Sequence, residues 1–461
     1  MYKAKGPPAP VLSGAAHPPR TAVVLAAGYS QRLSPLTSGG SKLLLRLGGV
    51  TLIERTVRAL RRQGVERVVV VLGHDEAKVA EALRRAAWDW VEIVRAQGWE
   101  SGNGSSLAAA EPVVSDEPLF LLLVGDHLYG DAALDPLVTV GCPAALLDPH
   151  PVADVLVEAT RVVVEDGTAV RFGKEVGSGW ADCGAFLVPP AIFECQRQAA
   201  AGGDHGLAGA ISRLAAICPL RAVPLPEDAW WQDVDTPADV RRATARLRHS
   251  LAKAQDGPVS RYLNRPLSTR ISMLLAPARL SPDLVTWLAF ALGVAAGALL
   301  ASGQGLAGAL VTHAASVLDG VDGELARLQL RASPRGALLD GFLDRLADVA
   351  IVAGLGLWSL TQGLNPSIAL GLTVAASAGS LLSMATKDRI AALKLPRAPE
   401  RSLGFLLGGR DGRLLLVTVL ALLGRPALAL AAVTIASLVS AVLRVALVRR
   451  GFAKPDSWPT A

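Results

Sequence analysis

Hydrophobic and polar positions follow different patterns in the two halves of the chain. From Thr21 to about Leu247, short apolar runs alternate with amphipathic stretches. Runs such as TAVVLAAG, VERVVVVLG and PLFLLLVGD are typical of buried strands, whereas TLIERTVRALRRQG and DEAKVAEALRRAA have the periodicity of helices. Strands that alternate with helices predict an α/β domain with a mostly parallel sheet.

The pattern changes at about Pro258, after which the apolar stretches are long. The first segment, SRYLNRPLSTRISMLLAPARL, mixes basic and apolar residues as a helix on a membrane surface does. A helix needs about 20 apolar residues to span a bilayer. We therefore expect an all-α polytopic membrane domain with six transmembrane helices, near 284–301, 304–326, 337–360, 366–386, 410–424 and 427–447. The fifth of these stretches is short and begins with charged residues.

Basic residues alternate between the loops that connect these stretches. The loops after the second and the fourth stretch are rich in arginine and lysine, as is the C-terminal tail, whereas ASGQG, TQGLNPS and LGRP are almost uncharged. Basic loops stay on the cytoplasmic side of a membrane. The asymmetry predicts a multi-pass protein of the cell (inner) membrane, with the soluble domain and both termini in the cytoplasm.

Composition supports this division. The chain has 461 residues, 51% of them hydrophobic, and a net charge of +6 that we attribute to membrane topology rather than to nucleic-acid binding. Its four cysteines form no CxxC pair, so we expect neither a zinc site nor a disulfide framework. We divide the chain into a flexible tail (1–20), a soluble domain (21–247), a linker with the interfacial helix (248–282), a membrane domain (283–450) and a second tail (451–461).

Four aspartates lie among leucine, alanine and glycine in LDGVDGELARLQLRASPRGALLDGFLD, where an uncompensated carboxylate is costly. Asp319 and Asp322 are three residues apart. Asp340 and Asp344 are four apart, so each pair shares one face of a helix. A turn between the helices would bring the pairs together, and such carboxylates repel unless hard cations, Mg²⁺ or Mn²⁺, neutralise them. The alternative is a solvated loop whose aspartates pair with nearby arginines.

Small residues beside the aspartates leave room for a ligand. Gly320, Gly323 and Ala326 leave the helix backbone accessible. Arg327 can grip a phosphate with two nitrogens. Together these features predict a site for a metal-bound diphosphate.

The stretch resembles the signature of the CDP-alcohol phosphatidyltransferase family, D-x2-D-G-x2-A-R-x8-G-x3-D-x3-D, at every position. The resemblance implies six spans, two divalent metals and displacement of CMP from a CDP-linked donor by an alcohol. It implies that Gly323, Ala326 and Arg327 bind the donor, and that Asp344 is the general base for the acceptor hydroxyl. The implied metal ligands are Asp319, Asp322, Asp340 and Asp344.

A basic segment, PERSLGFLLGGRDGR, precedes the fifth apolar stretch. Arg401, Arg410 and Arg413 in this segment could clamp a phosphate on the acceptor, and the inositol-phosphate branches of the family place arginines in this region. Positive-inside charge alone is the alternative for any one of them.

The soluble half begins with VVLAAGYSQRLSPLTSGGSKLLLRLGG, a strand that runs into a loop of small residues. Backbone N–H groups in such a loop can surround phosphates, and Arg32 and Lys42 add positive charge. The stretch resembles the nucleotidyltransferase signature LAAGxGxRLxP…PKxLxxxxGxxLI, except that Ser30 replaces a glycine and Ser41 a proline. The resemblance implies a Rossmann-like α/β nucleotidyltransferase (cytidylyltransferase) domain in which Arg32 and Lys42 are catalytic. Its implied nucleotide-binding positions are Leu25, Ala26, Ala27, Gly28 and Lys42.

Three further segments agree with this resemblance. ESGNGSSLAAA resembles the region that recognises a pyrimidine, with Asn103 and Ser106 at the binding positions. Asp126 ends the buried strand in LVGDH, where a carboxylate can hold Mg²⁺. Asp235 in WQDVDTPADV, with Asp233 as its substitute, would complete the metal site. A strand-end turn at Asp126 and a helix N-cap at Asp235 are the structural alternatives.

The segment FGKEVGSGWADCGAF resembles the substrate side of the same family. Lys174 would bind the substrate phosphate. Asp182 would bind a hydroxyl group of a polyol.

The two halves together resemble the bifunctional inositol-1-phosphate cytidylyltransferase / di-myo-inositol phosphate phosphate synthase family. That resemblance implies that CTP and inositol 1-phosphate give CDP-inositol and diphosphate. CDP-inositol and a second inositol 1-phosphate then give di-myo-inositol phosphate phosphate and CMP, a step in compatible-solute synthesis. CDP-alcohol phosphotransferases often pair through their spans, which implies a homodimer.

Two other interpretations are compatible with the residues. In one, the N-terminal half makes a CDP-linked head group and the C-terminal half is a phospholipid-synthesising phosphotransferase. In the other, the C-terminal half is a non-catalytic membrane anchor. The intact aspartate signature argues against an anchor, and the solubility of the product in water distinguishes the lipid enzyme from the favoured one.

Overall fold

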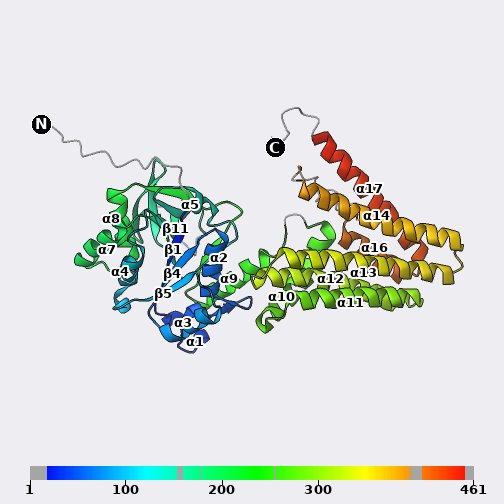
Figure 1. Cartoon of the computed structure of the whole chain (residues 1–461), viewed down its shortest axis with the longest axis horizontal. Coiled ribbons are helices and arrows are strands. Elements are labelled where there is room, and N and C mark those ends of the chain that lie inside the picture. The colour runs from blue at the N-terminus through cyan, green and yellow to red at the C-terminus, as the bar shows by residue number, and fades with distance from the viewer. Residues whose placement is uncertain are drawn as a thin grey trace. The chain divides into compact units, whose positions relative to one another are not determined.

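The computed structural model describes residues 18–152, 159–177, 179–253, 256–393, 395 and 408–451. The chain forms two compact units, with the boundary between Arg246 and Leu247 (Figure 1). Both predicted tails lie almost entirely outside the described residues.

A nine-stranded sheet forms the centre of the first unit. Its strands are β1 (Thr21–Ala26), β4 (Arg67–Leu72), β5 (Val91–Arg95), β6 (Phe120–Val124), β8 (Ala144–Asp148), β9 (Arg161–Glu165), β10 (Thr168–Gly173), β11 (Trp180–Val188) and β12 (Leu220–Pro224). Their order is β5-β4-β1-β6-β11-β8-β12-β10-β9. Side chains alternate between the faces, so that Ala22 and Val24 on β1 join one buried cluster and Val23 joins another.

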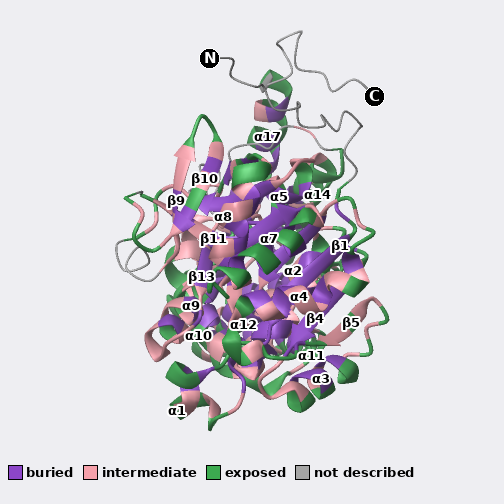
Figure 2. Ribbon diagram, turned by 90° about the vertical axis from the view of Figure 1, so that its left-hand side faces the viewer, coloured by how far each residue is buried: buried purple, intermediate pink, exposed green. Residues whose placement is uncertain are grey.

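Helices cover both faces of this sheet. The α-helices described in the first unit are α1 (Ser34–Thr37), α2 (Leu52–Arg62), α3 (Glu76–Arg85), α4 (Asn103–Val114), α5 (Asp135–Thr139), α7 (Ala191–Ala201), α8 (Leu207–Ile217) and α9 (Pro237–His249). Residues of α2, α3 and α5 pack in the cluster on one face, and residues of α4, α7 and α8 in the cluster on the other. β1 is buried along its whole length between these layers (Figure 2).

Two short ribbons complete the first unit. They are β2 (Arg46–Leu47) with β3 (Val50–Thr51), and β7 (His127–Tyr129) with β13 (Trp231–Asp233). Both ribbons are antiparallel. The second ribbon lies at the candidate site described below.

The sheet is parallel over β5, β4, β1 and β6, as the alternation of strands and helices predicts. Beyond β6 it is mixed, because β11 is antiparallel to both β6 and β8, whereas β8 and β12 are parallel. The prediction of a mostly parallel sheet is therefore correct for β5, β4, β1 and β6 and for the β8–β12 pair, but not for the other neighbouring strands. The long strand β11 also pairs with β9, and so connects the parallel part to the β9–β10 hairpin.

The helix predicted at TLIERTVRALRRQG is α2, and its first turn shows why it begins there. Thr51 Oγ1 accepts a hydrogen bond from the Glu54 N–H at 3.3 Å, and Glu54 Oε2 accepts one from the Thr51 N–H at 3.1 Å. This capping box satisfies two backbone donors that the helix leaves without partners. Ile53, Val57 and Leu60 then recur at helical spacing and are fully buried.

The second unit is helical. Its longer helices are α10 (Arg265–Leu275), α11 (Pro282–Ala301), α12 (Gly305–Leu328), α13 (Pro334–Thr361), α14 (Pro366–Ala392), α16 (Arg410–Leu422) and α17 (Pro426–Gly451). A helix therefore lies at each of the predicted apolar stretches, from α11 to α17. By length and composition α11, α14 and α17 can span a membrane, whereas α12 and α13 carry the aspartates and α16 has 13 residues.

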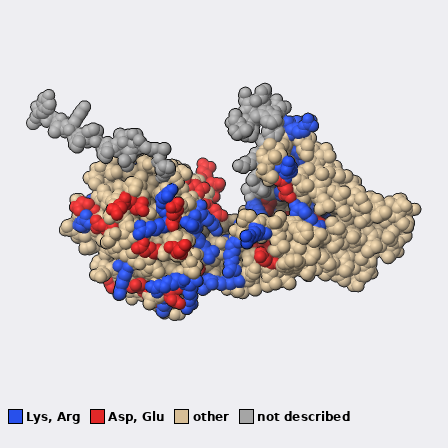
Figure 3. Space-filling view, in the orientation of Figure 1, with Lys and Arg blue, Asp and Glu red and all other residues tan. Residues whose placement is uncertain are grey.

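Charged residues gather at one end of the second unit, and the rest of the surface of that unit is almost free of them in the view of Figure 3. Large apolar side chains such as Leu288, Leu370 and Ile435 are exposed along its helices. Exposed apolar surface of this extent is typical of contact with lipid. The second unit is therefore associated with a membrane.

Glycine allows α11 and α13 to approach each other closely. A Cβ atom at Gly297 would lie 2.4 Å from the carbonyl oxygen of Ala350, and one at Gly354 would lie 2.1 Å from the carbonyl oxygen of Gly297. Real Cβ atoms do not come this close to backbone, so only glycine fits at either position. Small residues at helix crossings let backbones pack closely within a membrane, where no hydrophobic effect draws helices together.

Candidate active sites

The β7–β13 ribbon assembles the first site. His127 on β7 stands opposite Asp233 on β13. Asp126 precedes β7 at the end of the buried strand β6, where the Gly125 N–H donates to the Leu25 carbonyl at 2.8 Å. The ribbon thus brings together carboxylates that lie far apart in the sequence.

The geometry of this cluster fits a divalent cation. Asp126, His127 and Asp233 each offer a ligand atom, and these atoms lie within 4.8 Å of one another. His127 Nδ1 is 2.8 Å from Asp126 Oδ1 and 4.0 Å from Asp233 Oδ1. Asp233 Oδ1 is shielded from solvent and has no hydrogen-bond partner in the described part of the chain. Such an oxygen is costly unless a ligand satisfies it.

Lys42 and Arg32 reach the same group of carboxylates. The Lys42 amine lies 2.7 Å from Asp126 Oδ2 and also contacts Asp235. Arg32 contacts Asp235 as well, and 59% of its side chain is exposed. The structure therefore places Asp235 between two cations, while Asp126 and Asp233 converge with His127.

Burial and charge together set the protonation of this cluster. Burial would lower the pKa of Lys42, but Asp126 and Asp235 outweigh it and hold the pKa above its ordinary value. Burial likewise opposes the charged form of His127, yet Asp233 and Asp126 raise its pKa to about 9. Burial raises the pKa of Asp233 to about 7 against the attraction of His127. Before a metal binds, Lys42 and His127 are therefore cationic at neutral pH, and a divalent cation that takes His127 as a ligand would have to displace its proton.

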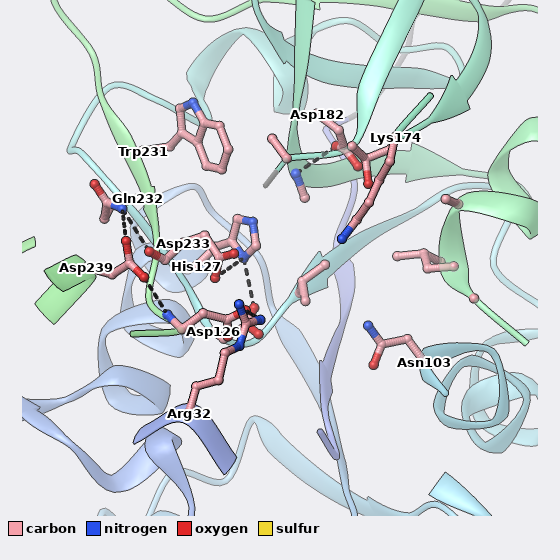
Figure 4. Close-up of a pocket in the computed structure, with 18 of the residues that line it drawn as sticks. Arg32, Asn103, Asp126, His127, Lys174, Asp182, Trp231, Gln232, Asp233 and Asp239 are labelled. Atoms are coloured by element: carbon pink, nitrogen blue, oxygen red, sulfur yellow. Dashed lines mark hydrogen bonds and ion pairs between the residues drawn. The ribbon is translucent and has the colours of Figure 1, made fainter. Parts of the chain in front are cut away.

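A cavity of about 460 Å³ opens beside the cluster (Figure 4). Lys174 extends its amine into this cavity, and Asp182 lines it from β11. The Gly184 N–H donates to Asp182 Oδ1 at 2.8 Å, while burial raises the pKa of that carboxyl to about 6. Asn103, at the start of α4, also lines the cavity, whereas Ser106 is buried within α4. The cavity thus joins the predicted metal and substrate residues of this unit with Arg32 and with one predicted nucleotide residue, Asn103.

The two serines that depart from the signature both fix the backbone at Lys42. Ser30 is buried, and its Oγ accepts a hydrogen bond from the Lys42 N–H at 2.8 Å. Ser41 Oγ accepts one from the Leu43 N–H at 3.3 Å and caps the short 3₁₀ helix that begins at Lys42. Hydroxyl groups therefore hold the lysine in place at the two positions where the signature has glycine and proline.

The predicted nucleotide loop follows the end of β1. Leu25, Ala26 and Ala27 have buried side chains, and the Ala27 carbonyl accepts a hydrogen bond from the His74 N–H at 3.1 Å. A Cβ atom at Gly28 would meet nothing within 4 Å, which leaves the backbone at this residue open to a ligand.

The second site lies where side chains of α12 and α13 converge. Carboxylate oxygens of Asp319, Asp340 and Asp344 lie within 4.8 Å of one another. Asp322 has a different neighbour and accepts a hydrogen bond from Thr286 Oγ1 at 2.6 Å. Asp340 Oδ1 is shielded from solvent and lacks a hydrogen-bond partner among the described residues. Three converging carboxylates with an unsatisfied oxygen fit a divalent cation.

A cavity of about 340 Å³ adjoins these carboxylates. Its lining includes the predicted residues Asp322, Gly323, Ala326, Arg327 and Asp340. Gly320 instead packs against α10, where a Cβ atom would lie 3.3 Å from Ser268 Oγ. The predicted donor-binding residues therefore border one cavity, while Gly320 serves helix packing.

Arg410 connects the aspartates to the segment predicted to bind the acceptor. Its Nη1 is 2.6 Å from Asp319 Oδ1 and 3.1 Å from Asp344 Oδ1. Its Nε donates to Asp348 Oδ1 at 3.1 Å. With Lys387 it also lines a smaller cavity of about 150 Å³. Of the two predicted acceptor arginines that the structure describes, Arg410 is thus the one that reaches both the carboxylates and a cavity.

Arg413 has a different position. It is buried, and it donates to Asp348 Oδ2 at 3.0 Å and to the Gly408 carbonyl at 2.8 Å. Arg401 lies outside the described residues.

Two residues of these sites do not follow from our reading of the sequence, namely His127 and Asp348. The signal for His127 is weak, because it consists only of the position next to Asp126 at the end of a strand. The signal for Asp348 is stronger, since it lies four positions after Asp344 and therefore on the same helix face.

Family models match parts of both units. Residues 22–159 match a MobA-like NTP transferase domain, and residues 279–408 match a CDP-alcohol phosphatidyltransferase. Together with the two carboxylate sites, these matches define an enzyme in which a nucleotidyltransferase is joined to a CDP-alcohol phosphatidyltransferase.

Relatives that match more than nine tenths of the chain define this class of enzyme more narrowly. A bifunctional IPC transferase and DIPP synthase from Rubrobacter xylanophilus is 37% identical over 440 residues, or 93% of this chain and 97% of the relative. One of the same name from Thermococcus kodakarensis is 32% identical over 448 residues, or 96% of this chain and 99% of the relative. The chain belongs to the family of bifunctional IPC transferases and DIPP synthases. A solved structure, the inositol-1-phosphate CTP transferase from T. maritima, is similar over 51% of this chain and 99% of its own, with 23% identity and a TM-score of 0.46.

Proposed function

We propose that the protein catalyses two successive reactions. The soluble unit converts CTP and inositol 1-phosphate to CDP-inositol and diphosphate. The membrane unit converts CDP-inositol and a second inositol 1-phosphate to di-myo-inositol phosphate phosphate and CMP. The observation that carries the proposal is that each unit has its own converging carboxylate cluster beside a cavity, in a chain whose relatives match it over both units.

In the first reaction, a phosphate oxygen of inositol 1-phosphate bonds to the α-phosphorus of CTP as the bond to diphosphate breaks. The nucleophile is already an anion, so no side chain has to remove a proton. Lys42 and Arg32 would bind the phosphates of CTP and hold them in line with the nucleophile. Lys174 would bind the phosphate of the substrate, and Asp182 one of its hydroxyl groups. Bound Mg²⁺ would offset the phosphate charge at the carboxylate cluster.

In the second reaction, a hydroxyl group of inositol 1-phosphate bonds to the phosphorus that carries inositol in CDP-inositol, and CMP leaves. A hydroxyl group is a weak nucleophile until a base takes its proton. Asp344 would accept this proton, because its carboxylate belongs to the cluster and lies 3.1 Å from Arg410, the residue that would hold the acceptor nearby. Arg327 would bind the donor from the wall of the larger cavity. Mg²⁺ held by the aspartates would offset charge on the diphosphate.

Arg410 would bind the phosphate of the acceptor. It lines the smaller cavity with the basic side chains of Lys387 and Arg444, and the carboxylates of Asp256 and Asp411 also border this cavity. Arg413 would act indirectly, because it holds Asp348, and Asp348 in turn orients Arg410.

The membrane unit would cross the bilayer six times, from α11 to α17. α12 and α13 have 24 and 28 residues, enough to span it with their charged residues at one surface. α16 is roughly 20 Å long and would require a locally thinner bilayer. The basic loops favour a multi-pass topology in the inner membrane with the soluble unit in the cytoplasm, and a homodimer would form through the spans.

The direct test is product analysis with the purified full chain. CTP, Mg²⁺ and a panel of polyol phosphates are supplied, and products are identified by mass spectrometry. We expect CDP-inositol, CMP and di-myo-inositol phosphate phosphate from inositol 1-phosphate, with the final product in water rather than in chloroform. A product that partitions into chloroform would favour the phospholipid enzyme, and the absence of CMP would favour the membrane anchor.

A further inference from the structure

The chain just before α10 is tied to the helix that carries the first two aspartates. Leu251 is buried, and its carbonyl accepts a hydrogen bond from Arg327 Nη2 at 3.1 Å. Asp256 Oδ2 accepts one from the Lys253 N–H at 2.9 Å. Neighbours within the membrane unit thus hold the backbone at Leu251 and at Lys253.

A buried ion pair anchors this segment further. Arg265 donates to Asp256 through Nε at 2.8 Å and through Nη2 at 3.1 Å, and its Nη1 donates to Glu324 at 2.5 Å. Glu324 is fully buried and also accepts hydrogen bonds from Ser268 and Ser272, each at 2.6 Å. A buried charge network with its oxygens satisfied holds one geometry. Glu324 lies two residues after Asp322, so the anchor is on the signature helix itself.

Lys253 lines the 340 Å³ cavity that Asp322, Arg327 and Asp340 also border. Its side chain is exposed, and it forms no ion pair with any described residue. The buried Nε of Arg327, in the same wall, has no hydrogen-bond partner among the residues that the structure describes. Lys253 and Arg327 therefore border one cavity, and both have N–H groups that can donate hydrogen bonds to a ligand. The cavity lies beside carboxylates that fit a divalent cation.

We propose that Lys253 binds the diphosphate group of the CDP-linked donor, together with Arg327. The assignment rests on the proposed second reaction and adds a residue from outside the aspartate signature. An ammonium group suits this role because it pairs with phosphate as a compact charge and its flexible stem can follow the ligand. The segment that the sequence marks only as a linker is thus part of the donor site.

The test uses the full chain, supplied with CDP-inositol and inositol 1-phosphate and no CTP. In Lys253→Ala we expect KM for CDP-inositol to rise roughly tenfold, the effect of one charged hydrogen bond. The inhibition constant of CDP in this reaction should rise in parallel, while KM for inositol 1-phosphate stays unchanged. Lys253→Arg should restore most of the binding, because it keeps the charge.

Two controls make the result decisive. Arg270→Ala removes an exposed cation from α10 and should leave KM for CDP-inositol unchanged. The first reaction of Lys253→Ala, from CTP and inositol 1-phosphate to CDP-inositol, should equal that of the wild type. An unchanged KM for CDP-inositol in Lys253→Ala, or an equal loss in both reactions, would overturn the assignment. No turnover of CDP-inositol by the wild type would instead overturn the proposed function, and this assignment with it.

Discussion

At the scale of residues, each site holds a cation between carboxylates. Lys42 contacts Asp126 and Asp235 in the soluble unit, and Arg410 contacts Asp319 in the membrane unit. A phosphate that enters either site meets a cation that is already in position, which reduces the reorganisation needed for catalysis. Substitutions at these positions should therefore separate the two reactions.

Replacing Asp344 with asparagine keeps the shape of the side chain but removes the base. We expect the second reaction to slow roughly 10²–10⁴-fold, the range that a general base contributes. CDP-inositol should then accumulate, because the soluble unit still makes it. Chromatography of the products from CTP and inositol 1-phosphate measures both effects. If CDP-inositol formation were lost too, in a protein that melts like the wild type, the two reactions would not have separate sites.

Replacing Lys42 with alanine should have the opposite effect. We expect release of diphosphate from CTP to slow roughly 10²–10³-fold, as when one group that stabilises transition-state charge is lost. Turnover of supplied CDP-inositol should not change. Lys78→Ala is the matched control, because Lys78 is 71% exposed and, among the described residues, its amine pairs with Asp75 alone. Equal rates of diphosphate release in the two variants would mean that Lys42 only balances the charge of nearby aspartates.

At the scale of elements, the helical site was more predictable than the site in the α/β unit. The spacing of Asp340 and Asp344 predicts one helix face, and both aspartates converge with Asp319. β7 and β13 have three residues each, too few to show a strand period, so no pattern indicates that His127 faces Asp233. Their pairing depends on tertiary context rather than on local sequence.

The glycine contact between α11 and α13 gives a prediction at this scale. Gly354→Ala would push a Cβ atom into the Gly297 carbonyl and should destabilise the membrane unit by about 1–3 kcal/mol, the usual cost of overpacking. Gly371→Ala on α14 is the control, because a Cβ atom there would meet nothing within 4 Å. Thermal unfolding in detergent measures both. Equal melting temperatures would show that the helices can separate without loss of stability.

At the scale of the whole molecule, the change in hydrophobic pattern predicts two units, and a helix lies at each predicted apolar stretch of the second. No sequence pattern indicates that β11 runs antiparallel to β6 and β8, because the direction of a strand depends on the strands with which it pairs and not on its own residues. The sequence likewise does not predict that Lys253 lines the donor cavity, since a short polar segment between two domains is usually interpreted as a linker. Long periodic elements were therefore predictable, and long-range pairing was not.

The central claim is that two separate sites act in sequence through CDP-inositol. Asp126→Ala tests it most directly, because this variant lacks a carboxylate of the first cluster and keeps the second cluster whole. We expect no final product from CTP and inositol 1-phosphate, and product at the wild-type rate once CDP-inositol is supplied in place of CTP. Failure of supplied CDP-inositol to restore the product, in a folded protein, would contradict the claim.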